Sequence, residues 1–147
     1  MTITVEAAKE LIELAFEHGA QYGKAVAVAV VDAGGFLVAL ERQNGARPIT
    51  PSIATSQAYS AAVMQRPTAD LKGWSTADPT LFAQVAGMGM YPILASPGGV
   101  PVKRQGELLG GLGVAGALGT EDQAISEAAL TAAGYELSFD AWPAVQR

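Results

Sequence analysis

Glycine is concentrated in one segment, residues 98–123, which reads GGVPVKRQGELLGGLGVAGALGTEDQ. Inside a regular strand a glycine costs about 0.5–1 kcal/mol relative to alanine, but it lets main chain approach a neighbour or a ligand closely. A strand that carries Gly110, Gly111 and Gly113 and is followed by Gly116 is therefore expected to gain close packing, a bulge or a bound group. The segment is predicted to form the rim of a small-molecule site.

The first third of the chain predicts one helix and one hairpin. Apolar residues recur at helical spacing from residue 4 to residue 18, with acidic and basic residues on the other side. Two strand-like runs, residues 24–31 and 36–40, are joined by the sequence DAGG. Because so short a turn joins neighbouring antiparallel strands, the sheet is expected to be antiparallel here.

The middle of the chain is predicted to be helical and segmented. Thr50 precedes a proline in the form of an N-cap, and the helix that it starts should end before the proline at position 67. Residues 67–72 are expected to form a short helical piece ended by Gly73. Asp78 again precedes a proline and predicts a further helix start.

The last third predicts three strands and a helix. Residues 93–95 form a short apolar run, and residues 100–104 and 107–114 predict a second hairpin. Thr120 and Gln123 fit a capping box, which begins a last helix that should end near Gly134. The predicted fold class is α+β: an antiparallel sheet of about five strands flanked by helices, in one domain over residues 1–147, with residues 135–147 as a tail that contains Trp142 and Pro143.

Composition excludes several classes of function. The formal net charge is −5 and the chain has no Lys/Arg run, which argues against nucleic acid and anionic membranes as partners. The absence of cysteine removes disulfides, thiolate nucleophiles and thiolate-bound metals. Neither a signal peptide nor an apolar run of membrane-spanning length is evident, so a cytoplasmic location is expected.

His18 is the one histidine, and hence the natural nitrogen ligand for a metal or a haem iron. At about 100° per residue it lies about 20° from Leu11, inside the apolar arc of the first helix, so its ring is predicted to face shielded surface. The structural alternative is a partly buried histidine whose charged form is stabilised by the carbonyls of a helix end. Both interpretations stay open on the residues alone.

Two features are typical of anion sites. The backbone N–H groups of residues 117–122, at the start of the last helix, are expected to receive a carboxylate. Arg47, before a proline on a glycine-containing loop, is a reasonable clamp for a ligand carboxylate. Gln57 and Tyr59 are two residues apart on the second helix and therefore face different sides, so either alone is a candidate for the pocket.

The chain resembles the GlcG/HbpS-like haem-binding family, whose domain is also similar to the C-terminal part of PduO-type cobalamin adenosyltransferases. The similar segments are VAVAVVDAGGFLVALERQNGA, IATSQAYSAA with the following RPT, and GGVPVKRQGELLGGLGVAGALGTEDQAISEAAL. Two departures stand out. The GVSG typical of the family reads GVAG here, with Ala115 in place of serine, and Gln57 replaces the usual lysine.

The resemblance implies a profilin-like sandwich, assembly into a homo-oligomer and, in some members, bound haem. The leading hypothesis is thus a cytoplasmic oligomer that binds haem or a related tetrapyrrole, with His18 as the candidate iron ligand and with Arg47 or the helix start at Thr120 receiving propionates. The candidate ligand-binding residues are His18, Arg47, Thr50, Gln57, Gly98, Gly99, Ala115, Gly116, Thr120 and Asp122.

Two alternatives of different classes remain. One is a small catabolic enzyme, a lyase or isomerase of an organic acid, that uses the same cleft, needs no cofactor and has no assignable catalytic residue. It requires an ordered polar cluster around the glycine-rich segment. The other is an assembly or sensory module without a ligand, in which an Ala/Gly-rich surface of another subunit fills the cleft.

Overall fold

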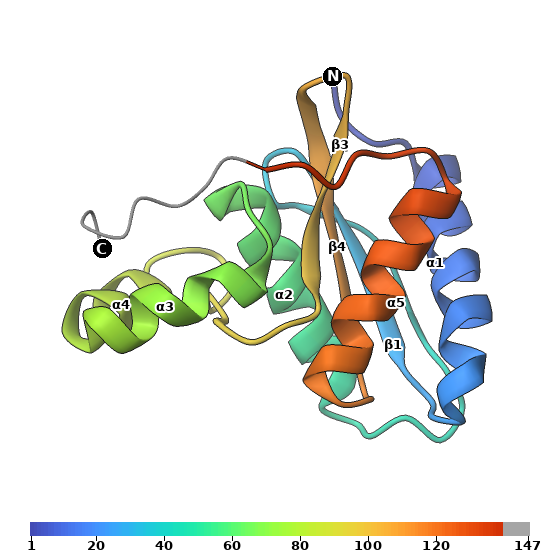
Figure 1. The fold of residues 1–147 in the computed structure, drawn as a ribbon, viewed down its shortest axis with the longest axis horizontal. Coiled ribbons are helices and arrows are strands. Elements are labelled where there is room, and N and C mark those ends of the chain that lie inside the picture. Colours follow the sequence, from blue (N-terminus) through green and yellow to red (C-terminus); the bar gives the residue numbers. More distant parts are fainter. Residues whose placement is uncertain (140–147) are drawn as a thin grey trace.

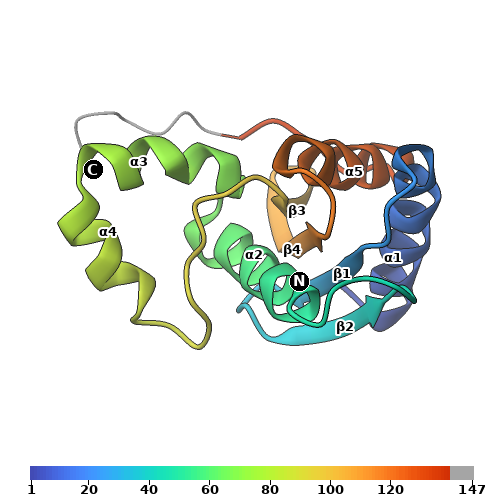
Figure 2. The same ribbon diagram turned by 90° about the horizontal axis from the view of Figure 1, so that it is seen from below.

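Four antiparallel strands form a single sheet in the computed structural model, which describes residues 1–139, and helices cover both faces of that sheet (Figures 1 and 2). The strands are β1 (Ala27–Asp32), β2 (Leu37–Arg42), β3 (Gly99–Arg104) and β4 (Glu107–Ala115), in the spatial order β2-β1-β4-β3. The helices are α1 (Val5–Gly19), α2 (Thr50–Met64), α3 (Leu71–Ala77), α4 (Pro79–Ala86) and α5 (Gly119–Ala132), with short 3₁₀ turns η1 (Ala20–Tyr22) and η2 (Thr68–Asp70). The predicted α+β class is confirmed.

Strand β1 lies in the middle of the sheet and is buried on both faces. Its alternate residues Val28 and Val30 belong to the core beneath α1 and α5, whereas Ala27, Ala29 and Val31 belong to the core beneath α2. Side chains alternate between the faces of a strand, so a strand covered on both sides carries apolar residues at every position. This explains the unbroken apolar run in the sequence.

Helix α2 packs closely on the sheet because glycines in β4 leave no side chain between the two backbones. A Cβ at Gly111 would collide with the carbonyl of Ala58, and one at Gly113 with the carbonyl of Ala54. Small residues on both partners thus bring helix backbone against strand backbone. The predicted close packing of the glycine-rich strand is confirmed, and its partner is this helix.

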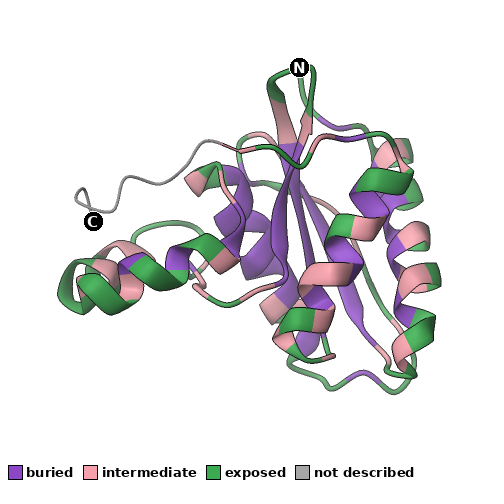
Figure 3. Cartoon of the chain, in the orientation of Figure 1, coloured by how far each residue is buried: buried purple, intermediate pink, exposed green. Residues whose placement is uncertain are grey.

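Helices α1 and α5 cover the other face of the sheet (Figure 2). Thr4 caps α1, because its hydroxyl accepts a hydrogen bond from the N–H of Ala7 at 3.1 Å. Leu11 and Ile12 of α1 and Ile125 and Leu130 of α5 are fully buried, and purple marks the inward surface of both helices in Figure 3. Of the two cores that lie against the sheet, the larger is the one beneath α1 and α5.

Helices α3 and α4 extend away from the sheet as an arm (Figure 1). Asp78 caps α4 as predicted, since its carboxylate accepts from the N–H of Leu81 at 3.1 Å. Trp74 and Phe82 pack edge to face, with ring centroids 5.1 Å apart. The hydroxyl of Tyr59 on α2 accepts from the N–H of Met90 at 3.1 Å, so α2 also holds the loop that leads back from the arm.

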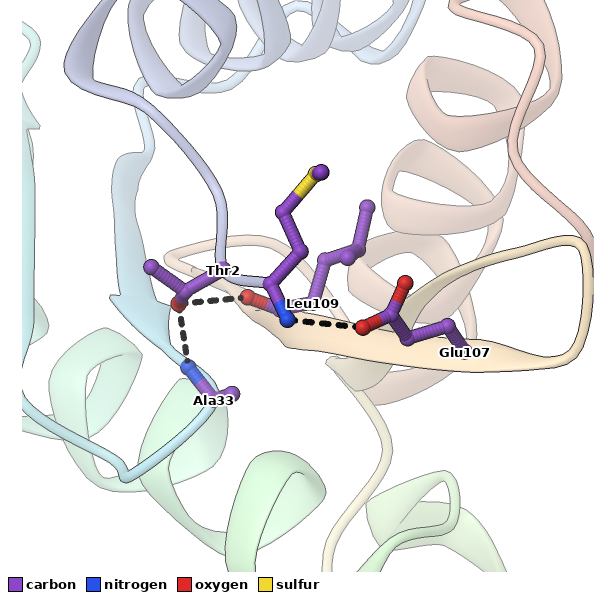
Figure 4. Close-up of polar contacts among 5 residues, drawn as sticks. Thr2, Ala33, Glu107 and Leu109 are labelled. Carbon is purple, nitrogen blue, oxygen red and sulfur yellow. Dashed lines mark hydrogen bonds and ion pairs between the residues drawn. The ribbon is translucent and has the colours of Figure 1, made fainter.

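The first residues of the chain contact both the β1–β2 turn and strand β4 (Figure 4). The Thr2 hydroxyl donates to the carbonyl of Leu109 at 3.1 Å and accepts from the N–H of Ala33 at 2.9 Å. The terminal ammonium of Met1 lies 2.7 Å from the carboxylate of Glu107. The N-terminal segment thus ties the β1–β2 turn to β4.

Three predicted details of the fold are wrong. Residues 93–95 form no strand, so the sheet over residues 1–139 has four strands rather than about five. Gly73 does not end a helix, because α3 runs through it. Thr50 is the first residue of α2 rather than its N-cap, and its hydroxyl donates to the carbonyl of Arg47 at 2.7 Å.

The predicted tail is described only to residue 139, and Trp142 and Pro143 lie outside the described residues. Tyr135 is buried, and the guanidinium of Arg104 lies 4.1 Å from its ring centroid. No helix among residues 1–139 has the length and hydropathy that crossing a membrane requires.

Candidate functional site

A cavity of about 280 Å³ opens where the first turn of α2, the end of β4 and the start of α5 come together. Thr50, Gln57, Ala115 and Asp122 are almost fully buried and form its inner wall. The lining residues are Arg47, Ile49, Thr50, Ile53, Gln57, Ser96, Pro97, Ala115, Gly116, Ala117, Gly119 and Asp122. Segments from four parts of the sequence therefore meet at one hollow.

Gln57 contributes an amide that is only half satisfied. Its Nε2 donates to the carbonyl of Pro97 at 3.0 Å. Its Oε1 is buried and has no hydrogen-bond partner among residues 1–139. An unsatisfied buried acceptor costs about 1–3 kcal/mol, and residues 1–139 supply no donor to offset that cost.

Gly98 lies behind this amide and connects its own segment to α5 through two hydrogen bonds. Its N–H donates to Gln123 Oε1 at 3.0 Å, and its carbonyl accepts from Ser126 Oγ at 2.7 Å. Thr68 Oγ1 donates to the carbonyl of Ser96 at 2.6 Å and accepts from the N–H of Gly99 at 2.9 Å. These bonds fix the carbonyl that orients the Gln57 amide.

Asp122 places a carboxyl group on the inner wall, and only 5% of the residue is exposed. The Ala117 N–H donates to its Oδ1 at 3.0 Å. The pKa of Asp122 is raised to about 6: burial raises it most and the neighbouring Glu121 adds to this, whereas backbone N–H groups and Lys24 lower it. This carboxyl group therefore gains or loses its proton near neutral pH.

Arg47 places a cation at the mouth of the cavity, next to Ile49, which is 57% exposed. Within the described part of the chain, its guanidinium makes no hydrogen bond or ion pair. Its backbone carbonyl accepts hydrogen bonds from both the N–H and the hydroxyl of Thr50. The mouth thus offers an unpaired cation beside an apolar side chain.

The structure brings together most of the residues that the sequence proposed for the site. Of the predicted residues, those that line the cavity are Arg47, Thr50, Gln57, Ala115, Gly116 and Asp122. Gly98 and Gly99 lie directly behind Gln57, where a Cβ on either would overlap with that residue. His18 and Thr120 are not among the lining residues, and Tyr59, on another side of α2, binds the arm instead.

The predicted capping box at Thr120 is wrong. Helix α5 begins at Gly119, Thr120 is exposed, and Gln123 accepts from Gly98 rather than returning to the helix start. Glu121 takes the capping role, since its Oε1 accepts from the N–H of Leu118 at 3.0 Å. Bonds to Lys24 and to that amide hold the pKa of Glu121 below its ordinary value.

This arrangement changes the expected anion site at the helix start. The N–H groups of Ala117 and Leu118 already donate to the carboxylates of Asp122 and Glu121. A ligand carboxylate at that point would meet two acidic side chains. Arg47, which also lines the cavity, remains the group that can receive it.

His18 lies in the last turn of α1, on the face of the sheet opposite α2 (Figure 2). The residue is half-buried, so its ring is less shielded than the helical arc predicted. Over residues 1–139 no three His, Cys, Asp or Glu side chains gather in a way that could hold a metal ion. Any iron bound through His18 would have this one histidine as its nitrogen ligand from the chain.

Sequence reasoning missed Ser96, Pro97 and Ile53 as cavity residues. Pro97 acts through its carbonyl, and a backbone acceptor leaves no signal in residue type. Ile53 follows Thr50 by one helical turn, so the spacing of α2 could have indicated it.

Residues 3–131 match the family model described as haem degrading protein HbpS-like. The chain belongs to the HbpS-like family. Protein GlcG of Escherichia coli K12 is 31% identical over 113 residues, which cover 76% of this chain and 80% of GlcG.

Solved structures of this HbpS-like protein's relatives share its fold. A double mutant of HbpS from Streptomyces reticuli is 32% identical, covers 91% of this chain and 88% of its own, and has a TM-score of 0.81. The structure entitled PduOC:Heme Complex has a TM-score of 0.84 at 24% identity, covers 93% of this chain and 99% of its own, and so shows the fold alone. The resemblance to the PduO C-terminal domain is confirmed at that level.

Proposed function

We propose that this protein binds haem or a related tetrapyrrole as part of an oligomer, with Arg47 receiving a propionate and His18 as the candidate iron ligand. Membership of a family described by haem degradation supports the ligand, as does a neighbour solved as a haem complex. The observation that carries the proposal is the unpaired guanidinium of Arg47 beside the exposed side chain of Ile49. A porphyrin edge carries propionates on an apolar ring, so a cation beside apolar surface complements it.

The cavity is large enough for part of a haem but not for the whole molecule. A cavity of about 150 Å³ holds benzene, so the 280 Å³ present here take a propionate but not four pyrrole rings linked by methine bridges. The macrocycle would therefore stay outside, on the surface at the mouth. Helix α1, whose last turn contains His18, ends at the same end of the domain at which α5 begins (Figure 1).

Hemin titration of the purified apoprotein tests the proposal. We expect a saturable Soret shift at micromolar protein, which His18→Ala displaces in wavelength and weakens in affinity. Arg47→Gln should weaken hemin binding about five- to tenfold without moving the Soret maximum, because it removes a charge-assisted contact and leaves the iron ligand. Arg42→Gln is the matched control, since Arg42 is also exposed and does not line the cavity.

The mass of the protein in solution, measured with and without hemin, tests the oligomeric part. A monomer at all concentrations would contradict it. No Soret shift at micromolar protein would overturn haem binding whatever the mass.

A further inference from the structure

We propose that the cavity between α2 and α5 binds a small organic acid that also carries a hydroxyl or amino group, and that this binding does not require haem. The acid's carboxylate would pair with Arg47 at the mouth. Its hydrogen-bond donor would reach the inner wall formed by Gln57 and Asp122. Three features of the cavity carry this inference: its volume, the position of its one cation, and its surplus of acceptors.

The volume sets the size of the ligand. The cavity measures about 280 Å³, roughly twice the volume of about 150 Å³ that accommodates benzene. A single ring with two polar substituents, or an aliphatic acid of similar size, fills such a space. A tetrapyrrole exceeds it.

The charges set the orientation of the ligand. Among the lining residues Arg47 and Asp122 are the charged ones, with Arg47 exposed at the mouth and Asp122 buried within. Lys24, the other cation near Asp122, pairs with Glu121 at 2.7 Å. A carboxylate is thus attracted to the mouth and repelled from the inner wall once Asp122 is ionised.

Once Asp122 is ionised, the side chains of the inner wall offer acceptors and no free donor. Gln57 is 2% exposed, its Nε2 is committed to the Pro97 carbonyl, and its Oε1 has no partner in residues 1–139. Thr50 does not supply the donor, because its hydroxyl bonds to the carbonyl of Arg47. Ala115 and Gly116 present no side-chain donor either. A ligand hydroxyl or amino group is therefore the complement of this wall.

Isothermal titration calorimetry of the wild-type protein with 3-hydroxybenzoate, benzoate and phenol measures the three affinities and so tests the proposal. The first probe has both functions, and each of the others lacks one. We expect 3-hydroxybenzoate to bind at least tenfold more tightly than either control. The 2- and 4-hydroxy isomers and lactate complete the set, because they vary the distance between the two groups.

Two variants assign the contacts. Arg47→Gln should weaken the binding of both carboxylates about tenfold and leave the binding of phenol unchanged. The control Arg42→Gln should change the affinity for none of the three compounds. Gln57→Leu should abolish the advantage of 3-hydroxybenzoate over benzoate, and thermal melting shows that each variant is folded.

Failure of all the hydroxy acids to bind at millimolar concentration overturns the inference. Equal affinities of wild-type protein for 3-hydroxybenzoate and benzoate also overturn it, since a water molecule would then satisfy the wall equally well. Hemin binding is measured independently, through the Soret band, so either proposal can fail while the other stands.

Discussion

Gly98 and Gln57 fit together so closely that a Cβ at position 98 would lie 2.5 Å from Gln57 Oε1. Gly98 also has a φ of +136°, a conformation that side chains disfavour. The same glycine binds Gln123 and Ser126 of α5. One residue thus links the two helices that bound the cavity, and its lack of a side chain leaves room for the amide on the inner wall.

Gly98→Ala is therefore expected to destabilise the fold by about 3 kcal/mol or more, because it adds a collision to an unfavourable φ. Urea denaturation gives the free energy of unfolding. Gly106→Ala is the matched control: it has a φ of +79° and open space around the added Cβ. It should cost only about 1–2 kcal/mol. Equal costs for the two variants would show that the contact with Gln57 carries no energy.

Asp122→Asn should change how stability depends on pH. The pKa of Asp122 rises from its ordinary 3.8 to about 6 on folding, so the folded state favours the protonated form. The resulting stabilisation is fully present below pH 3.8 and is lost as the pH rises through about 6. The substituted amide stays neutral throughout and keeps an oxygen for the Ala117 N–H.

The variant should accordingly be more stable than the wild type at pH 8, by up to about 3 kcal/mol. This advantage should shrink towards pH 4. Chemical denaturation at several pH values measures it. Parallel pH profiles for the two proteins would mean that Asp122 is ionised at no cost in the folded state.

The fold was largely predictable because its strongest signals are local. Helix α1 shows apolar periodicity after a capping Thr4, and the hairpins have short turns that leave few alternatives. Predictions were wrong where tertiary contacts override local preference. Gly73 is accommodated within α3, and Ile93 is buried by packing under the arm rather than by strand pairing.

Much of the lining of the candidate cavity could be predicted from the sequence, but few of its hydrogen bonds could. The glycines of residues 98–123 indicated a close approach of backbone, and the structure shows one at Gln57. The residues Thr120 and Gln123 have the spacing of a capping box. In the structure, however, Gln123 accepts a hydrogen bond from Gly98, which is distant in sequence. A long-range partner cannot be read from local spacing, nor can the free oxygen of Gln57, which depends on where the Pro97 carbonyl lies.

Gly113→Ala should prevent α2 from packing on the sheet. The added Cβ would meet the backbone of Ala54 and Ala58, which cannot move without displacing the helix. We expect a loss of about 3 kcal/mol or more in the free energy of unfolding, measured by urea denaturation. Gly73→Ala serves as the control: it lies within α3 with nothing near its Cβ position, and should gain up to about 1 kcal/mol.

Hemin and the small acid should compete, because each is proposed to use the guanidinium of Arg47. In wild-type protein, 3-hydroxybenzoate at ten times its Kd should raise the apparent Kd for hemin about tenfold by mass action. In Arg47→Gln the acid should have little effect, and phenol should have none in either protein. Soret titrations with and without each compound measure the shift. If saturating acid leaves the hemin affinity of the wild type unchanged, the haem contacts lie away from Arg47, and His18 becomes the residue around which its site must be sought.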